Sequence, residues 1–177
     1  MSILSFLGLA GSASAESSSA DTQTVRRIVA SLDAMDPERA RYIAAFAFLL
    51  CRVARTDLHI GDEEAAAMER IVMEKGGLTE EQAVLVLQIA KVQEALFGGT
   101  EGYLVTREFN KIASREQKIA MLDCLFAVSA ADQSISTVED NEIVRICAEL
   151  QLPREEVISA RSRYREYLAV LKNLPRP

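Results

Sequence analysis

The chain has 177 residues, a formal net charge of −6 and a pI of about 5.0. This length fits one domain of ordinary size, and a hydrophobic content of 49% is enough to build a core. The acidic charge argues against a general nucleic-acid binder, because such proteins present a positive surface to phosphates. Aromatic residues make up only 6% and Trp is absent, a composition that favours helices over strands.

Residues 1–22 read as a short apolar segment followed by a flexible tether rich in Ser and Ala. No basic residue precedes the apolar run, and the run is short, so the pattern disfavours an export signal. We expect this segment to dock on the domain, on a protein partner or, weakly, on a membrane surface. Its large apolar residues are spaced for one helical face: Ile3, Leu4, Phe6 and Leu7.

The rest of the chain has helical periodicity and no sustained two-residue alternation. Helix starts are marked by Asp36-Pro37 and by capping-box patterns that begin at Thr79, Ser114 and Ser136. Gly76-Gly77 and Gly98-Gly99 are natural stops. The sequence predicts helices near residues 23–33, 37–55, 62–75, 79–96, 101–112, 115–131, 137–150 and 154–171.

Two of these helices, at residues 42–54 and 119–131, are apolar nearly all round, so other helices or lipid must surround them. Lipid is disfavoured because a membrane span needs about 20 apolar residues, whereas Arg52 interrupts the first stretch and Asp123 the second. The sequence therefore predicts an all-α fold. It also predicts that residues 23–172 form a single helical bundle around two buried central helices.

The chain also contains an internal repeat. Aligned on Asp57 and Asp132, each unit has a central helix, an acidic turn, a second helix, a short turn and a third helix. This predicts two tandem three-helix-like repeats that pack as a closed bundle rather than as an array. The matching pairs include Val53 with Val128, Ile60 with Ile135, Glu64 with Glu139, and Ile71 with Ile146.

The acidic turns have two interpretations, and the first is structural. In the second turn Ser136 is a helix N-cap and Glu139 its reciprocal partner. Acidic residues in a first helical turn are also favoured by the helix dipole. Asp57 and Asp132 each follow the carboxyl end of a long helix, and the partial negative charge there disfavours an anion. Asp is nevertheless common in turns, because its side chain can accept a hydrogen bond from the N–H two residues on. Ile135 is expected to point into the core.

The second interpretation is a compensating cation beside these aspartates, either an Arg side chain or a bound metal. Carboxylates and main-chain carbonyls are the hard oxygen donors that calcium or magnesium would use. An ordinary EF-hand is excluded, because its first and third ligand positions would be Val53 and Arg55, or Val128 and Ala130 in the second copy. The candidate metal ligands are Asp57, Glu64, Asp132 and Glu139.

The segments VARTDLHIGDEE (53–64) and VSAADQSISTVE (128–139) resemble the A-D-G-x-I-S-x-x-E turn of the TerB-like family, a helical domain of tellurite-resistance and co-chaperone proteins. The resemblance covers about residues 25–170. It implies an all-helical bundle connected with metal or oxyanion stress. It also implies acidic residues suspected of binding divalent cations, and work in larger assemblies at or near the cytoplasmic membrane.

Three positions depart from that pattern. Leu58 and Gln133 follow the Asp where Gly is usual, and Gly61 stands where Ser is expected. A side chain after the Asp makes a left-handed backbone conformation harder, which bears on the ligand geometry. No J-domain signature is present, so co-chaperone activity is not implied.

The sequence contains no GxGxxG, GxxxxGK[ST], HExxH or GxSxG pattern, and its three cysteines lack a CxxC pair. We expect buried free thiols in a reducing, cytoplasmic setting. The basic run near the carboxyl end is expected to be a solvated face, or else to receive an acidic partner or anionic lipid. It contains Arg161, Arg163, Tyr164, Arg165, Tyr167 and Lys172.

The function expected from these observations is a non-enzymatic TerB-like binding and assembly module with protein partners, in the cytoplasm or at the inner face of the membrane. Calcium or magnesium is the expected ion if one binds. The alternative is a plain interaction domain whose acidic turns only cap helices and whose amino-terminal segment recruits it to a membrane or partner.

Overall fold

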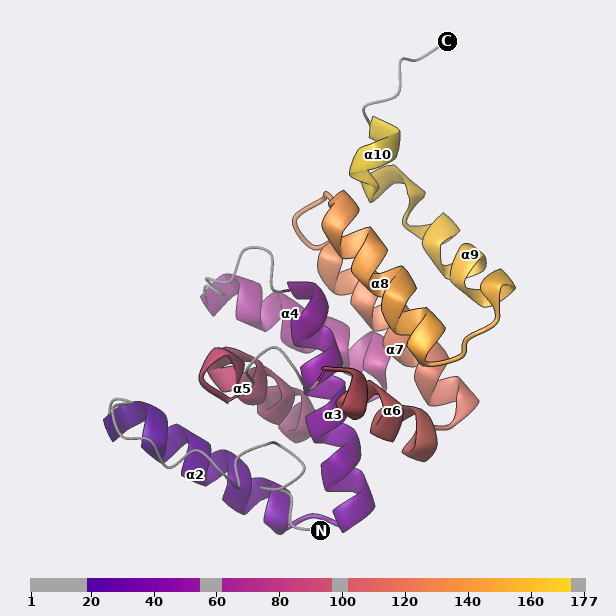
Figure 1. Ribbon diagram of the computed structural model, residues 1–177. Helices are drawn as coiled ribbons and strands as arrows, with labels where there is room; N and C mark the ends of the chain where they lie inside the picture. Colours follow the sequence, from indigo (N-terminus) through magenta and orange to yellow (C-terminus); the bar gives the residue numbers. More distant parts are fainter. Residues whose placement is uncertain (1–18, 55–61, 97–101, 173–177) are drawn as a thin grey trace.

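The computed structural model describes residues 19–54, 62–96 and 102–172. These residues form helices joined by short turns, and the one β-bridge among them pairs Ile135 with Leu168. The all-α prediction is confirmed (Figure 1). The helices are α2 (Ser19–Asp33), α3 (Pro37–Ala54), α4 (Asp62–Gly76), α5 (Glu80–Leu96), α6 (Gly102–Ile112), α7 (Arg115–Ser129), α8 (Thr137–Glu149), α9 (Arg154–Arg163) and α10 (Ala169–Lys172), with a 3₁₀ turn η2 (Arg165–Tyr167) before α10.

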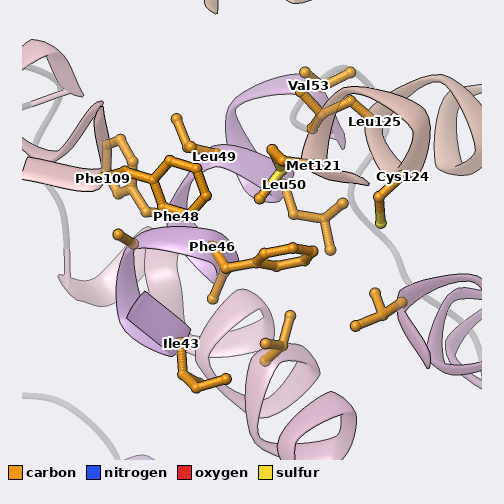
Figure 2. Packing of buried hydrophobic residues seen from close by; sticks show 14 of the residues in the cluster. Ile43, Phe46, Phe48, Leu49, Leu50, Val53, Phe109, Met121, Cys124 and Leu125 are labelled. Atoms are coloured by element: carbon orange, nitrogen blue, oxygen red, sulfur yellow. The ribbon is translucent and has the colours of Figure 1, made fainter. Parts of the chain in front are cut away.

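Helix α3 is the centre of the molecule. It starts as predicted: Asp36 Oδ1 accepts the backbone N–H of Glu38 at 2.9 Å and of Arg39 at 3.1 Å. From Tyr42 to Val53 every residue except Arg52 is buried. Figure 2 shows side chains leaving α3 on several sides, as the nearly continuous apolar sequence requires. The neighbours that cover α3 are α2, α5, α6, α7 and α8.

Helix α7 is the second central helix, but one side of it is only partly covered. It contacts α3, α4, α8 and α9. Asp123 and Ala127 are half-buried, because α9, which packs on this helix, is shorter and carries charged side chains. The fully buried apolar side is made by Met121, Leu122, Cys124, Leu125 and Phe126.

The packing of the two halves is reciprocal. Helix α4 packs on α7, and α8 packs on α3, so the second helix of each predicted repeat contacts the central helix of the other. The third helices stay with their own half, with α5 on α3 and α9 on α7. This arrangement suits a closed bundle; the duplication itself stays a prediction.

The sequence prediction was wrong about the two ends of the bundle. Helix α2 begins at Ser19, inside the segment predicted as a tether. The helix predicted at 154–171 is not continuous, since α9 ends at Arg163 and Leu168 is extended. Ile135 explains the break: its N–H donates to Tyr167 O at 2.7 Å, and its carbonyl accepts Ala169 N–H at 2.9 Å. An uninterrupted helix would use those backbone groups internally.

The three cysteines are free and buried, as predicted. Burial raises the pKa of Cys124 and of Cys147 to about 12, so at neutral pH both thiols stay protonated and are poor nucleophiles. Among the described helices, none has the length and apolar character needed to cross a membrane.

Candidate functional site

The second acidic turn joins α7 to α8 and is held by its own backbone. Asp132 is exposed, and its Oδ1 accepts the N–H of Ser134 at 3.0 Å. Gln133 has a φ of 66°, the left-handed conformation that the usual glycine would adopt without strain. Its N–H donates to Ala130 O at 2.9 Å. The residue after the aspartate therefore has a backbone conformation that glycine adopts readily, although Gln133 carries a side chain.

The predicted capping box at the start of α8 is confirmed. Ser136 Oγ accepts the N–H of Glu139 at 3.2 Å, and Glu139 Oε2 accepts the N–H of Ser136 at 2.8 Å. Asp132 and Glu139 thus each commit one oxygen to the main chain. A carboxylate has two oxygens and about four acceptor positions, so this use is compatible with a further ligand. Their metal-binding role stays a prediction.

The turn is also fastened to the carboxyl end of the chain. Ile135 is 1% exposed, which confirms its predicted inward direction, and it forms the parallel bridge with Leu168. The ammonium of Lys172 donates to the carbonyl of Gln133. This cation of the chain itself is held in the turn that follows the carboxyl end of α7, the end of a helix that favours positive charge. Sequence reasoning missed it, because no spacing rule connects residue 172 with residue 133.

The first acidic turn cannot be compared in the same way. Asp57 lies outside the described residues, and Glu64 belongs to α4 with only its backbone described. The structure therefore brings Asp132 and Glu139 into one turn and leaves the position of the other two predicted ligands open. Within the described ranges, no group of three or more His, Cys, Asp or Glu side chains could hold a metal ion.

A charged cluster inside the bundle was not predicted. Arg52, whose side chain is 10% exposed, donates to Glu142 Oε1 at 2.8 Å and to Glu149 Oε2 at 2.7 Å. It also donates to the hydroxyl of the buried Thr106 at 2.7 Å. One side chain of α3 thereby binds α6 and α8. The only sequence signal was Arg52 itself, the one charged residue in the otherwise apolar stretch 42–54.

Burial favours a raised pKa for Glu149, but its hydrogen bonds to Arg52 and Thr106 and the positive charge of Arg52 outweigh burial and lower its pKa. The carboxylates of this cluster are therefore occupied by a protein cation. They are structural tethers rather than a vacant ligand set.

Asp123 belongs to a second cluster, between α7, α4 and α9. Its Oδ1 accepts Arg163 Nη2 at 2.7 Å, and its Oδ2 lies 3.9 Å from the ammonium of Lys75. Tyr164 stacks on Phe126 with ring centroids 5.6 Å apart. Burial and the nearby Asp123 carboxylate raise the pKa of Tyr164 to about 12. These groups fix α9 on α7 and give no sign of acid–base chemistry.

The described geometry defines a class of protein: an all-helical bundle with a capped acidic turn between its central helix α7 and α8. The model of the family described as "Tellurite resistance protein TerB" matches residues 43–162, which run from α3 into α9 and include both acidic turns. The chain belongs to the TerB family. Comparison with curated proteins and with solved structures gives no significant match.

Proposed function

We propose that the chain is a non-enzymatic binding and assembly module that serves tellurite resistance or a related stress response at or near the cytoplasmic membrane. The family match across both acidic turns supports the connection with tellurite. The observation that carries the binding role is the second turn, where Asp132 stands exposed on a backbone fixed by a capping box and a β-bridge. A fixed turn presents its oxygen atoms without an ordering cost at the moment of binding.

The ligand we propose is a divalent cation, calcium or magnesium, bound by Asp57 and Glu64 in one turn and by Asp132 and Glu139 in the other. Carboxylate and carbonyl oxygens are the donors that these ions prefer. In the second turn the cation would use the carboxylate oxygens that do not accept backbone N–H groups. Water would complete the coordination, as is common for magnesium.

Calorimetric titration of the full chain with calcium, magnesium and manganese tests this proposal. We expect binding heat that falls in the Asp132→Asn variant and disappears when Asp57→Asn is added. An asparagine side-chain oxygen still accepts the Ser134 N–H, so the turn is expected to keep its shape while it loses the charge. Absence of heat with all three ions would remove the metal role and leave the plain interaction domain.

Two variants of the same capping box separate charge from structure. Glu139→Gln keeps the box, because Gln117 makes the same bond to Ser114 at the start of α7. It should weaken ion binding and lower stability by less than the loss of the cap, because only the favourable interaction of the charge with the helix dipole is removed. Ser136→Ala removes the cap and should cost about 1 kcal/mol while the carboxylates remain. Equal effects of the two variants on ion binding would show that only the fold of the turn matters.

The membrane part of the proposal concerns residues 1–18, which lie outside the described residues. Flotation of the full chain with anionic vesicles is expected to show weak association that is lost when Leu4 and Leu7 are both replaced by Asp, since membrane binding scales with buried apolar area. Replacing Ser12 and Ser14 by Asp in the tether adds the same charge and is the control. Unchanged flotation of the Leu4/Leu7 variant would exclude recruitment through this segment.

A further inference from the structure

A cavity of about 250 Å³ is lined by residues of α9, η2 and α10 and by Leu168. Helices α9 and α10 lie at the end of the molecule opposite α2 (Figure 1). Its base is apolar: Leu168 is 1% exposed, and Leu171 is half-buried. Ile158 on α9 is 56% exposed and forms one wall. We call this cavity the C-terminal groove, and its lining residues are Ile158, Arg161, Ser162, Arg165, Leu168 and Leu171.

Both walls of the C-terminal groove are fixed to the bundle. Arg161 on α9 makes a two-bond contact with Asp140 on α8, at 2.8 and 2.7 Å. Asp140 is 8% exposed and balanced by this guanidinium. The other wall is held by the bridge of Leu168 with Ile135. The groove is thus preformed, which lowers the ordering cost of binding.

The charged side chains that line the groove are both cationic although the chain is acidic overall. Two arginines line it and no carboxylate does. Arg161 is neutralised by Asp140, whereas Arg165 is exposed and forms no ion pair with any carboxylate in the described ranges. A cation beside an exposed apolar pocket attracts an acidic ligand and fixes its orientation.

We propose that the C-terminal groove docks an acidic amphipathic helix of a partner protein, which inserts a large aliphatic side chain against Leu168 and places a carboxylate on Arg165. The cavity is smaller than the roughly 300–1,000 Å³ of small-molecule sites, so it suits a side chain rather than a cofactor. Helices recognised in grooves use such anchors at intervals of three and four residues. This surface is separate from the acidic turns, so the proposal does not depend on ion binding.

Other occupants fit the groove less well. The apolar segment of this chain has no acidic residue before Glu16, so it could not pair with Arg165. A flat lipid surface would leave a concave pocket unfilled.

Methyl NMR of the full chain tests the proposal with synthetic helical peptides of about 15 residues. One peptide set carries Leu or Ile at i and i+4 flanked by Glu, and a matched set carries Lys in place of Glu. We expect the Glu peptides to shift the methyl signals of Ile158, Leu168 and Leu171, with a Kd below about 1 mM. The Lys peptides should bind at least about tenfold more weakly, because they bring like charge to Arg165.

Matched variants assign the contact. Arg165→Glu should weaken the Glu peptides about tenfold and strengthen the Lys peptides. Arg154→Glu, at an exposed position of α9 outside the groove lining, should change little. Ile158→Asp should abolish the methyl shifts. Val144→Asp on α8 replaces an aliphatic residue of similar exposure, 46% against 56%, and should not.

Five results would overturn the proposal. One is the absence of any peptide with a Kd below about 1 mM, and another is equal affinity for the Glu and Lys sets. A dimer that Ile158→Asp dissociates in ultracentrifugation would assign the groove to a second copy. If replacing Leu4 and Leu7 by Asp shifts the groove methyl signals of the chain without peptide, the groove would be assigned to the amino-terminal segment. Anionic vesicles that shift the same methyl groups and lose this effect in Arg165→Glu would assign it to lipid.

Discussion

Replacing Arg52 with methionine is expected to lower the free energy of unfolding by about 3 kcal/mol, the cost of leaving buried charges without their partner. Methionine keeps the apolar stem of the side chain, so the loss is mainly electrostatic. It leaves Glu142 and Glu149, whose side chains are only 19% and 18% exposed, without the guanidinium that they share. Urea denaturation at pH 7 measures the loss.

The stability loss caused by Arg52→Met should also depend on pH, in a direction that follows from the pKa of Glu149. In the wild type, Arg52 and Thr106 hold the pKa of Glu149 below its ordinary value of 4.5 despite burial. The stability from this interaction is therefore present above the unfolded pKa and is lost as the pH falls through the lower folded pKa. In the variant, burial without a cation should raise the pKa of Glu149 instead. The difference in stability between wild type and variant should shrink as the pH falls from 7 towards 4.5 and below.

Arg145→Met is the matched control. Arg145 contacts the same glutamate, Glu142, at 3.3 Å, but its side chain is 69% exposed. An exposed pair contributes little, so we expect a loss of no more than about 0.5 kcal/mol. Equal losses for the two variants, or a loss at Arg52 that does not vary with pH, would show that burial of the ion pair is not what stabilises this contact.

The features that the sequence predicted correctly depend on neighbouring residues. The capping boxes at Ser114 and Ser136 involve bonds between residues three apart, and the proline at the start of α3 acts within one helical turn. The stop of α4 is equally local, since Gly77 has a φ of 65° and its N–H donates to Met73 O. The run of apolar residues 42–54 similarly required burial on all sides, whatever covers it.

The features that it missed depend on residues far apart in the chain. The helix is interrupted after Arg163 because the backbone of Ile135 forms hydrogen bonds with the carbonyl of Tyr167 and the N–H of Ala169. The partners of Arg52 come from α6 and α8. No periodicity within one helix reports such a contact, because periodicity shows which face is buried and not what lies opposite.

In the candidate site, too, the local features were predicted and the features that depend on distant residues were not. The sequence located Asp132 and Glu139 in one turn and proposed the backbone bonds that such residues make, and these bonds are present. It did not foresee that Gln133 would adopt the left-handed conformation, a cost of roughly 1–2 kcal/mol for a residue with a side chain. That conformation persists where tertiary contacts determine the turn, here the bridge of Ile135 and the bond from Lys172.

The second large effect is expected at Phe46, a fully buried residue of α3 whose ring reaches the end of α4. Figure 2 shows its ring extending from α3 into the core. Phe46→Ala should lower the free energy of unfolding by about 3–5 kcal/mol, because the cavity that it leaves can collapse only partly. Urea denaturation measures this loss, and Val144→Ala, at an exposed position of α8, is the control, expected within about 0.5 kcal/mol.

The ring of Phe46 packs against Gly76 at the end of α4, and a double-mutant cycle can test this contact. A Cβ added at Gly76 would lie 2.7 Å from Phe46 Cζ, so Gly76→Ala overpacks the core and should cost about 1–3 kcal/mol. In a Phe46→Leu background the shorter side chain leaves room, and the cost of Gly76→Ala should fall by at least about 0.5 kcal/mol, the mark of residues in contact. Gly77→Ala, with open space and a φ of +65°, should instead cost about 1 kcal/mol through backbone strain in both backgrounds. Additive losses for Gly76→Ala and Phe46→Leu would mean that the ring of Phe46 does not seal the end of α4.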